Sequence, residues 1–263
     1  MRLVKFLGVL LVICLLTLIT QIGGLLFLVC YLVFRKNKVK LVLSFVVLYL
    51  VGTFLLVPLI APVFGREKIK TTKSVKLHIF LTSLTNRNYV VPQVNDVLSQ
   101  VSKGLQKSYP KIHIHCLDAN FPFWDGFPLL PHLSHNDGKK LDISLIYQDE
   151  KGRVVNDKPS RSGYGIFEVP KSNEYDQIAV CKRKGYWQYD FPKYLTLGEL
   201  TPDLNMSSKA TKKLLIEILK IKEVSKVFVE PHLRSRMQLT HPKLRYHGCK
   251  AVRHDDHIHL QVK

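Results

Sequence analysis

Two stretches of this chain are rich in side chains that bind metal ions. The first, PHLSHNDGKKLDISLIY (131–147), contains two histidines and an aspartate, and the second, HDDHIHL (254–260), contains three histidines. The candidate residues are His132, His135, Asp142, His254, His257 and His259. Imidazole nitrogen and carboxylate oxygen are both zinc ligands, and three protein ligands leave a fourth position for water, as in catalytic zinc sites. The two stretches therefore predict a hydrolytic zinc site if the fold brings them together.

The spacing within the first stretch indicates how two of these side chains meet. Residues 136–138, Asn-Asp-Gly, are a turn signal. The sequence LDISLIY that follows alternates between apolar and polar residues, as a half-buried strand does. His135 stands before the turn and Asp142 stands on the returning strand, so the turn can bring together two side chains seven residues apart.

The second stretch predicts a strand with two histidines on one face. In HIHLQV, His257 and His259 are two residues apart and share a face, while Leu260 and Val262 occupy the other. His254 does not fit this alternation, so we expect it in the turn before the strand.

Together the stretches offer a plausible set of three metal ligands: His135, Asp142 and His259. His257 lies beside them, and an imidazole in that position can take a proton from a metal-activated water. The sequence contains neither H-E-x-x-H nor H-x-x-E-H, which excludes the thermolysin-like and inverted zinc peptidases.

The order of these motifs resembles the LAS metallopeptidases, which include lysostaphin-type, D-Ala-D-Ala peptidase and hedgehog-type domains. The shared features are S-H-x6-D at 134–142 and H-x-H at 257–259. The histidines of H-x-x-H and H-x-x-H-x-H, together with VFVEPHLRSRM (227–237), look most like the penicillin-insensitive murein endopeptidases. The resemblance covers roughly residues 76–263.

This resemblance implies a zinc D,D-endopeptidase that hydrolyses the peptide cross-links of peptidoglycan. It implies three metal ligands: His135, Asp142 and His259. It also implies that His257 is the general base and that His254 and His132 line the site, where they orient water or stabilise the oxyanion. The chain departs from the secreted members of the group in its apolar N-terminal part and in its fewer cysteines, which leaves substrate access and bond specificity open.

Other interpretations of the same residues remain open. A D,D-carboxypeptidase, a dipeptidase or a peptidase of other peptides could use the same site. A membrane-tethered protein that binds metal and polyanions without catalysis is an alternative from another class. Nucleic acid is not an expected partner, because aromatic and basic residues are not interleaved as in proteins that stack bases. A structural zinc site, an inactive relative and a chance cluster are weaker alternatives.

The first 64 residues predict a membrane anchor. Residues 6–34 and 41–64 are uncharged runs of 29 and 24 residues, longer than the roughly 20 that a span needs. We expect a hairpin of two transmembrane helices, with Gln21, Gly23 and Gly24 marking a kink or a contact with a neighbouring helix. A cleaved signal peptide is disfavoured, because the first run is too long and lacks an A-x-A site before its basic flank.

Charge gives a weak indication of the orientation in the membrane. The loop RKNKVK between the runs carries four basic residues, which favours a cytoplasmic loop and an extracytoplasmic, periplasmic main domain at the inner membrane. Basic residues in the linker 65–76 oppose this orientation. Residues 65–263 hold 33 basic and 20 acidic residues, a formal charge of +13 that suits an anionic polymer or membrane surface.

The remaining chain predicts a basic linker at 65–76 and an α+β peptidase domain at 77–263. We expect strands at 77–84, 111–117 and 226–230, and helices at 90–107 and 207–222. These elements lack a regular βαβ alternation, which indicates α+β, and the family resemblance implies an antiparallel sheet. Three cysteines in this part, Cys116, Cys181 and Cys249, permit one disulfide of undetermined pairing.

Overall fold

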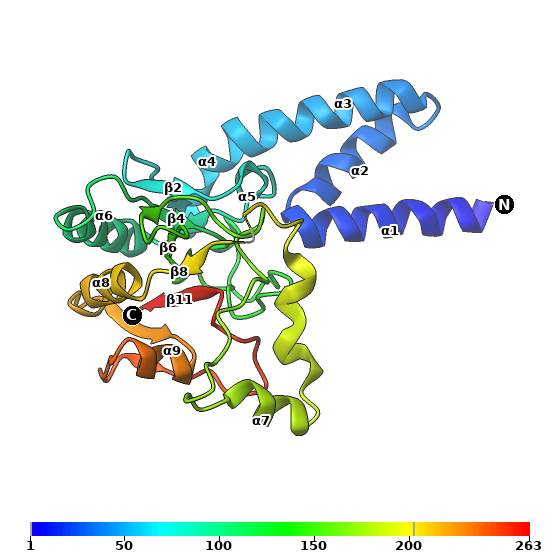
Figure 1. Cartoon of the computed structure of the whole chain (residues 1–263). Helices are drawn as coiled ribbons and strands as arrows, with labels where there is room; N and C mark the ends of the chain where they lie inside the picture. Colours follow the sequence, from blue (N-terminus) through cyan, green and yellow to red (C-terminus); the bar gives the residue numbers. More distant parts are fainter. Residues whose placement is uncertain (1, 202) are drawn as a thin grey trace. The chain divides into compact units, whose positions relative to one another are not determined.

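A computed structural model describes residues 2–201 and 203–263 of the chain. Figure 1 shows the helices and strands in colours that follow the sequence. The chain forms two compact units, each assembled from separate stretches of sequence. The first unit comprises Met1–Ile69, Phe80–Pro92 and Ala119–Lys139. The second unit comprises Lys70–Ile79, Gln93–Asp118 and Lys140–Lys263.

Apolar helices form much of the first unit. They are α1 (Arg2–Thr20), α2 (Gly23–Phe34), α3 (Lys38–Val51), the π-helical turn η1 (Gly52–Leu56), α4 (Val57–Ile60) and the 3-10 turn η2 (Ala61–Phe64). The last four follow one another without a break. Two helices, Leu3–Thr20 and Lys38–Phe64, are long and apolar enough to span a membrane, and Gly23–Phe34 is a shorter apolar helix.

The expectation of one helix across residues 6–34 is wrong, because the chain reverses at Gln21. The φ angle of Gln21 is 67°, and the hydroxyl of Thr20 accepts a hydrogen bond from the N–H of Gly23 at 2.8 Å. A Cβ atom at Gly24 would overlap the side chain of Thr17, so glycine permits the close approach of α1 and α2. The predicted kink is therefore a complete turn between two helices.

The rest of the first unit packs against the end of this helical part. It contains β1 (Glu67–Lys68), which pairs antiparallel with β3 (Tyr89–Val90), and α5 (Phe80–Leu84). The strand expected at 77–84 is wrong for its second half, since Phe80 stacks on Phe54 at 5.8 Å between ring centroids and the hydroxyl of Tyr49 donates to the carbonyl of Leu84 at 2.6 Å. These tertiary contacts override the strand pattern.

A six-stranded sheet is the centre of the second unit. Its strands, in spatial order, are β10 (Leu244–Arg245), β9 (Val224–Phe228), β11 (His257–Val262), β5 (Lys140–Ser144), β4 (Ile114–Cys116) and β2 (Val75–Leu77). The central pairs are antiparallel, whereas β10–β9 and β2–β4 are parallel. The fold is thus mixed α and β, as expected, with a mixed rather than purely antiparallel sheet.

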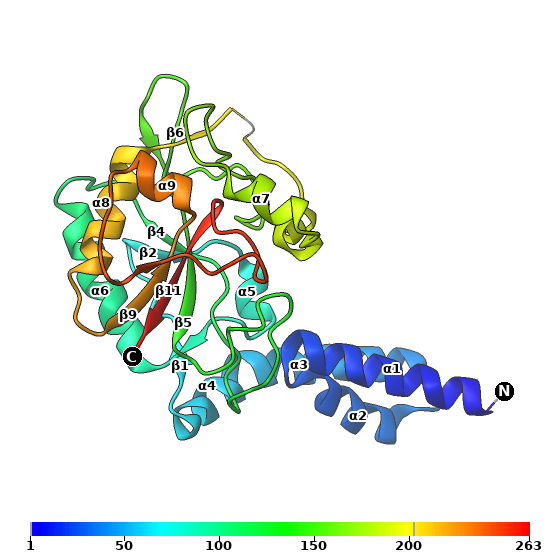
Figure 2. The ribbon, with the colours of Figure 1, turned by 90° about the horizontal axis from the view of Figure 1, so that it is seen from below.

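Helices and a smaller sheet complete the second unit (Figure 2). The helices are α6 (Pro92–Gln106), α7 (Gln177–Arg183), the 3-10 helix η3 (Trp187–Leu195), α8 (Ser208–Leu219) and α9 (Pro231–Arg236). The smaller sheet has the order β7 (Val154–Val155), β6 (Tyr147–Gln148) and β8 (Asn205–Met206). A disulfide joins Cys181 to Cys249, and Cys116 is free and buried.

The predicted helices at 90–107 and 207–222 are confirmed, with slightly shorter bounds. Both bury an apolar stripe, including Val97 and Val101 in α6 and Leu214 and Ile218 in α8, and the two helices lie side by side in Figures 1 and 2. The strand predicted through residue 147 is divided, because the carbonyl of Ile146 accepts hydrogen bonds from the start of α8 instead of continuing the sheet.

Candidate metal site

The central strand pair of the sheet places the second histidine stretch opposite Asp142. In the antiparallel register of β5 and β11, His259 pairs with Asp142 and His257 pairs with Ser144. The distance from His259 Nδ1 to Asp142 Oδ1 is 3.0 Å, and from His257 Nε2 to Asp142 Oδ2 it is 3.7 Å. All of these side chains are buried. The prediction that His257 and His259 share one face of a strand is confirmed.

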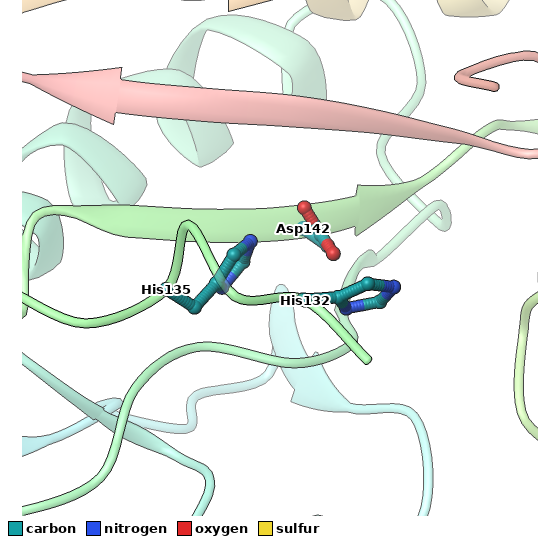
Figure 3. Close-up of side chains that lie close together, drawn as sticks. All are labelled: His132, His135 and Asp142. Atoms are coloured by element: carbon teal, nitrogen blue, oxygen red, sulfur yellow. The ribbon is translucent and has the colours of Figure 1, made fainter. Parts of the chain in front are cut away.

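The chain that enters β5 carries His132 and His135, and these residues form a possible metal-binding group with Asp142 (Figure 3). One ligand atom from each of the three side chains lies within 4.8 Å of the others, and all three residues are buried. The expected turn at 136–138 is present, with Gly138 at a φ of 78°. This group could hold a metal ion.

The tautomer of His135 is set by a backbone contact. Its Nδ1–H donates to the carbonyl of Ala119 at 2.6 Å, so Nε2 is the nitrogen that remains for a metal. Metal-binding histidines are commonly oriented in this way by a carbonyl or carboxylate on the other ring nitrogen. The ring centroids of His132 and His135 are 5.5 Å apart.

The compact group differs by one member from the ligand set expected from the sequence. It contains His132, whereas the sequence pointed to His259 as the third ligand. Asp142 belongs to both sets, because His259 contacts the same carboxylate. Two imidazoles and one carboxylate are an appropriate donor set for zinc in either case, so the residues fit the expected metal.

His257 is held on its far side by an aspartate that directly precedes it. Its Nδ1 lies 2.5 Å from Asp256 Oδ1, and the other carboxylate oxygen of Asp256 accepts the N–H of Gly165 at 2.6 Å. Burial opposes protonation of His257, but the carboxylates of Asp142 and Asp256 outweigh burial and raise its pKa to about 9. A histidine held in this way presents Nε2 toward Asp142.

His254 lies before β11, as predicted, and beside the strand histidines. Its ring centroid is 4.8 Å from that of His257 and 5.7 Å from that of His259. Its backbone N–H donates to Glu230, whose carboxylate also accepts the hydroxyl of Tyr189. Burial and the neighbouring imidazoles lower the pKa of His254 well below its usual value, so it is neutral at pH 7.

Two neighbouring residues, Arg253 and Asp255, fix the turn that precedes β11. Arg253 donates from Nε and Nη2 to the carboxylate of Asp255 and from Nη1 to Asp190, and its guanidinium lies 3.8 Å from the ring centroid of Phe167. Burial raises the pKa of Asp255 to about 7 although Arg253 opposes this shift. The two aspartates of HDDH thus have structural contacts rather than solvent exposure.

Tyr164 is the main residue of the site that sequence reasoning missed. Its hydroxyl donates to Asp142 Oδ2 at 2.9 Å and accepts the N–H of Asp118 at 3.1 Å. It lies between Gly163 and Gly165, both with a φ of 84°, and a Cβ at either glycine would meet neighbouring atoms. The G-Y-G triplet was the available signal, because only such a tight turn brings a tyrosine hydroxyl to the buried carboxylate.

His247 is a further residue that the sequence left unassigned. Its ring centroid lies 5.4 Å from that of His254 and 6.2 Å from that of His259, and its side chain is exposed. It is therefore the histidine of this group that is most open to solvent. Its spacing from HDDHIHL carries no motif, so the sequence offered no signal for it.

Comparison with known protein families and with curated proteins finds no match for this chain. The arrangement of the side chains is therefore the structural basis for assigning a function. It brings a buried His-His-Asp group close to further imidazoles, which is a combination suited to metal binding and proton transfer.

Proposed function

We propose that this protein is a membrane-anchored zinc peptidase of the LAS type that hydrolyses the D,D-peptide cross-links of peptidoglycan. The observation that supports this proposal is the shared carboxylate of Asp142, which contacts His259 from β11 and groups with His135 from the preceding turn. The motifs S-H-x6-D and H-x-H, in this order, are the pattern of the LAS family, and they contain the three residues of this group, His135, Asp142 and His259.

In this proposal His135, Asp142 and His259 hold the ion. A bound zinc ion would supply a Lewis acid and lower the pKa of a water molecule to about 7. His257 would receive the proton at Nε2, because Asp256 already occupies its Nδ1 side at 2.5 Å. An ion on Asp142 would neutralise the carboxylate that raises the pKa of His257 and so leave Nε2 free to accept. His254 or His132 stabilises the negative charge that develops on the peptide oxygen.

The disulfide supports an extracytoplasmic location for the second unit. Disulfides such as Cys181–Cys249 form and persist in oxidising compartments and are rare in the cytoplasm. We therefore propose that the second unit faces the periplasmic side of the inner membrane.

The reversal at Gln21 supports the same orientation. The turn between α2 and α3 and the N-terminal end of α1 lie at the same end of the helical part (Figures 1 and 2). Lys5 and the basic residues of 35–40 therefore gather on one side, which is the cytoplasmic side by the positive-inside rule.

The test combines metal content with digestion of purified, cross-linked muropeptide dimers. It requires the full chain, because the segment with His132 and His135 belongs to the same unit as the apolar helices. We expect one zinc per chain and metal-dependent conversion of dimers to monomers. His259→Ala should lose both properties, whereas His257→Ala should keep the metal and lose turnover.

Other outcomes would each reject part of the proposal. Release of single D-Ala residues would identify a carboxypeptidase on the same site. Bound zinc without cleavage of any muropeptide would indicate another peptide substrate or a protein that binds metal without catalysis. Folded protein without bound metal would refute the metal site itself.

A further inference from the structure

The second membrane-spanning helix extends past the turn between α1 and α2. A Cβ atom at Gly52 would lie 2.9 Å from Leu26 Cδ1 and 3.6 Å from Ile22 Cδ1, so Gly52 is level with the start of α2. The helical residues 53–64 continue beyond that level. The whole helix Lys38–Phe64 has 27 residues and a length of about 40 Å, about 10 Å more than the hydrocarbon core of a bilayer.

The extension is apolar and exposed, and further exposed apolar side chains of the first unit accompany it. Those on the helix are Leu55, Leu56, Leu59, Ile60, Val63 and Phe64. Those on the two segments that pack with it are Phe80, Leu81, Trp124, Leu130 and Leu133. We refer to these eleven residues as the apolar collar. Exposed apolar side chains in such number are costly in water and mark a contact with a partner or a membrane.

Named contacts fix the 119–139 segment to the helical part. The side chain of Gln21 donates to the carbonyl of Phe123 at 3.1 Å and accepts its N–H at 3.0 Å. The buried guanidinium of Arg66 donates to the carbonyls of Phe121 and Phe123 and pairs with Asp125. The segment therefore contacts both the turn that joins α1 and α2 and the chain that follows the helix Lys38–Phe64.

Trp124 shows what the collar is suited to contact. Its side chain is 59% exposed, and its ring meets Phe64, the last residue of the spanning helix, edge-on at 6.1 Å between centroids. Tryptophan is enriched at the membrane–water interface because its ring is amphipathic. The ammonium of Lys68 lies 5.5 Å from the ring centroid of Phe54, a residue of the same helix as Phe64, and a cation beside the collar suits anionic headgroups.

We propose that the apolar collar lies in the interfacial region of the lipid bilayer and holds the segment with His132 and His135 at the membrane surface. The occupant is lipid rather than a protein partner, because the collar continues the apolar surface of a helix that is itself long enough to span. The first unit is then more than a tether, since it positions two candidate site residues close to the headgroups. This inference does not depend on the proposed peptidase activity.

The chain offers a direct test, because it contains only two tryptophans, Trp124 and Trp187. Trp187 belongs to the second unit, and its side chain is 74% exposed. Trp187→Phe leaves Trp124 as the sole reporter, and Trp124→Phe leaves Trp187 as a matched reference. Both full-length variants are reconstituted in vesicles whose lipids carry bromine either near the glycerol end or near the end of the acyl chain.

We expect at least about threefold stronger quenching of Trp124 than of Trp187, with the shallow bromines more effective than the deep ones. Equal and weak quenching of both tryptophans would overturn the proposal. A blue-shifted Trp124 emission without quenching would also overturn the proposal. It would mean that Trp124 is covered by protein, such as a second copy of the chain, and not by lipid. Stronger quenching by the deep bromines would place the collar in the hydrocarbon core and contradict an interfacial position.

A third variant tests the part of the segment that carries the histidines. Leu133→Trp, in a background with Trp124→Phe and Trp187→Phe, places the reporter next to His132. We expect shallow bromines to quench it as they quench Trp124. Absence of quenching in a protein that keeps its native circular dichroism would show that the histidine segment lies away from the lipid.

Discussion

Replacement of Tyr164 by phenylalanine tests whether the buried contact to Asp142 supports metal binding. The change removes one oxygen atom from a fully buried site. That oxygen donates to Asp142 Oδ2 at 2.9 Å and accepts the N–H of Asp118 at 3.1 Å. Without it, the carboxylate loses the donor that fixes its orientation, and the amide of Asp118 loses its acceptor.

The expected size of the effect follows from these two contacts. A hydrogen bond to a charged group contributes about 1.5–3 kcal/mol. Removal of a partner that orients a metal ligand typically lowers metal affinity about 10- to 100-fold, which corresponds to roughly 1.4–2.7 kcal/mol. The two energy ranges agree. We therefore expect Tyr164→Phe to raise the Kd for zinc by about 10- to 100-fold while the protein stays folded.

Tyr147→Phe is a matched control for this experiment. Tyr147 is also fully buried, but its hydroxyl has no hydrogen-bond partner among the residues that the structure describes. Zinc affinity is measured on the full chain by competition with a chromophoric chelator, and circular dichroism monitors the fold. An unchanged Kd in folded Tyr164→Phe would refute the reasoning, and so would an equal loss in Tyr147→Phe.

Three further predictions concern the ligand set, the proton acceptor and a buried lysine. His259→Ala should lose bound zinc while His132→Ala retains it, as measured by atomic emission, and the reverse result would replace His259 by His132 as the third ligand. Asp256→Asn should keep zinc but lower turnover by about 10- to 100-fold, and an unchanged rate would show that His257 needs no partner at Nδ1. Burial lowers the pKa of Lys158 from 10.5 to about 7 in the folded protein. Between these two pH values the unfolded chain holds a proton on Lys158 that the folded chain has lost, so the free energy of unfolding rises with pH in this window. Lys158→Met should therefore raise the Tm more near pH 6 than near pH 10. The size of the pKa shift sets an upper limit of about 5 kcal/mol on the gain in the free energy of unfolding. An equal gain at both pH values would contradict this reasoning.

Local periodicity predicted the elements that carry the site. The alternation in HIHLQV predicted β11, and the stripe of apolar residues at 207–222 predicted α8. In α8 the buried face is the one that the apolar repeat predicts, whereas β11 is buried on both faces, with the histidines on one and Leu260 and Val262 on the other. The pairing of Asp142 with His259 was accessible as well, because each stands on a strand with a definite face.

Residues determined by distant contacts could not be predicted in the same way. Phe80–Leu84 has the composition of a strand, yet it forms a helix because Phe54 and Tyr49 supply partners from another part of the chain. The reversal at Gln21 similarly depends on hydrogen bonds to Phe123, which is 102 residues away. A pattern of local hydropathy contains no information about such partners.

The support of the site was hidden for a related reason. Tyr164 reaches Asp142 from a turn between two glycines, and Glu230 holds the backbone of His254 from the residue before α9. Tyr164 has no spacing relation to the histidine motifs, and Glu230 lies in the segment 227–237 of the family resemblance, for which the sequence indicated no contact with His254. Motif spacing therefore identifies candidate ligands, whereas the residues that orient them become visible only once the sheet has formed.

The apolar helices and the segment that carries His132 and His135 belong to the same unit. The sequence predicted a membrane anchor at 1–64, a basic linker at 65–76 and a peptidase domain at 77–263 as separate parts. Instead, Gln21 and Arg66 bond to the backbone of the 119–139 segment, so the helices and the segment with His132 and His135 stabilise one another. A truncated chain without its helices would lose these bonds, and loss of zinc in such a fragment would be the expected result of an unsupported loop. The candidate metal site is thus expected to need the full chain, because the apolar helices support the segment that carries His132 and His135.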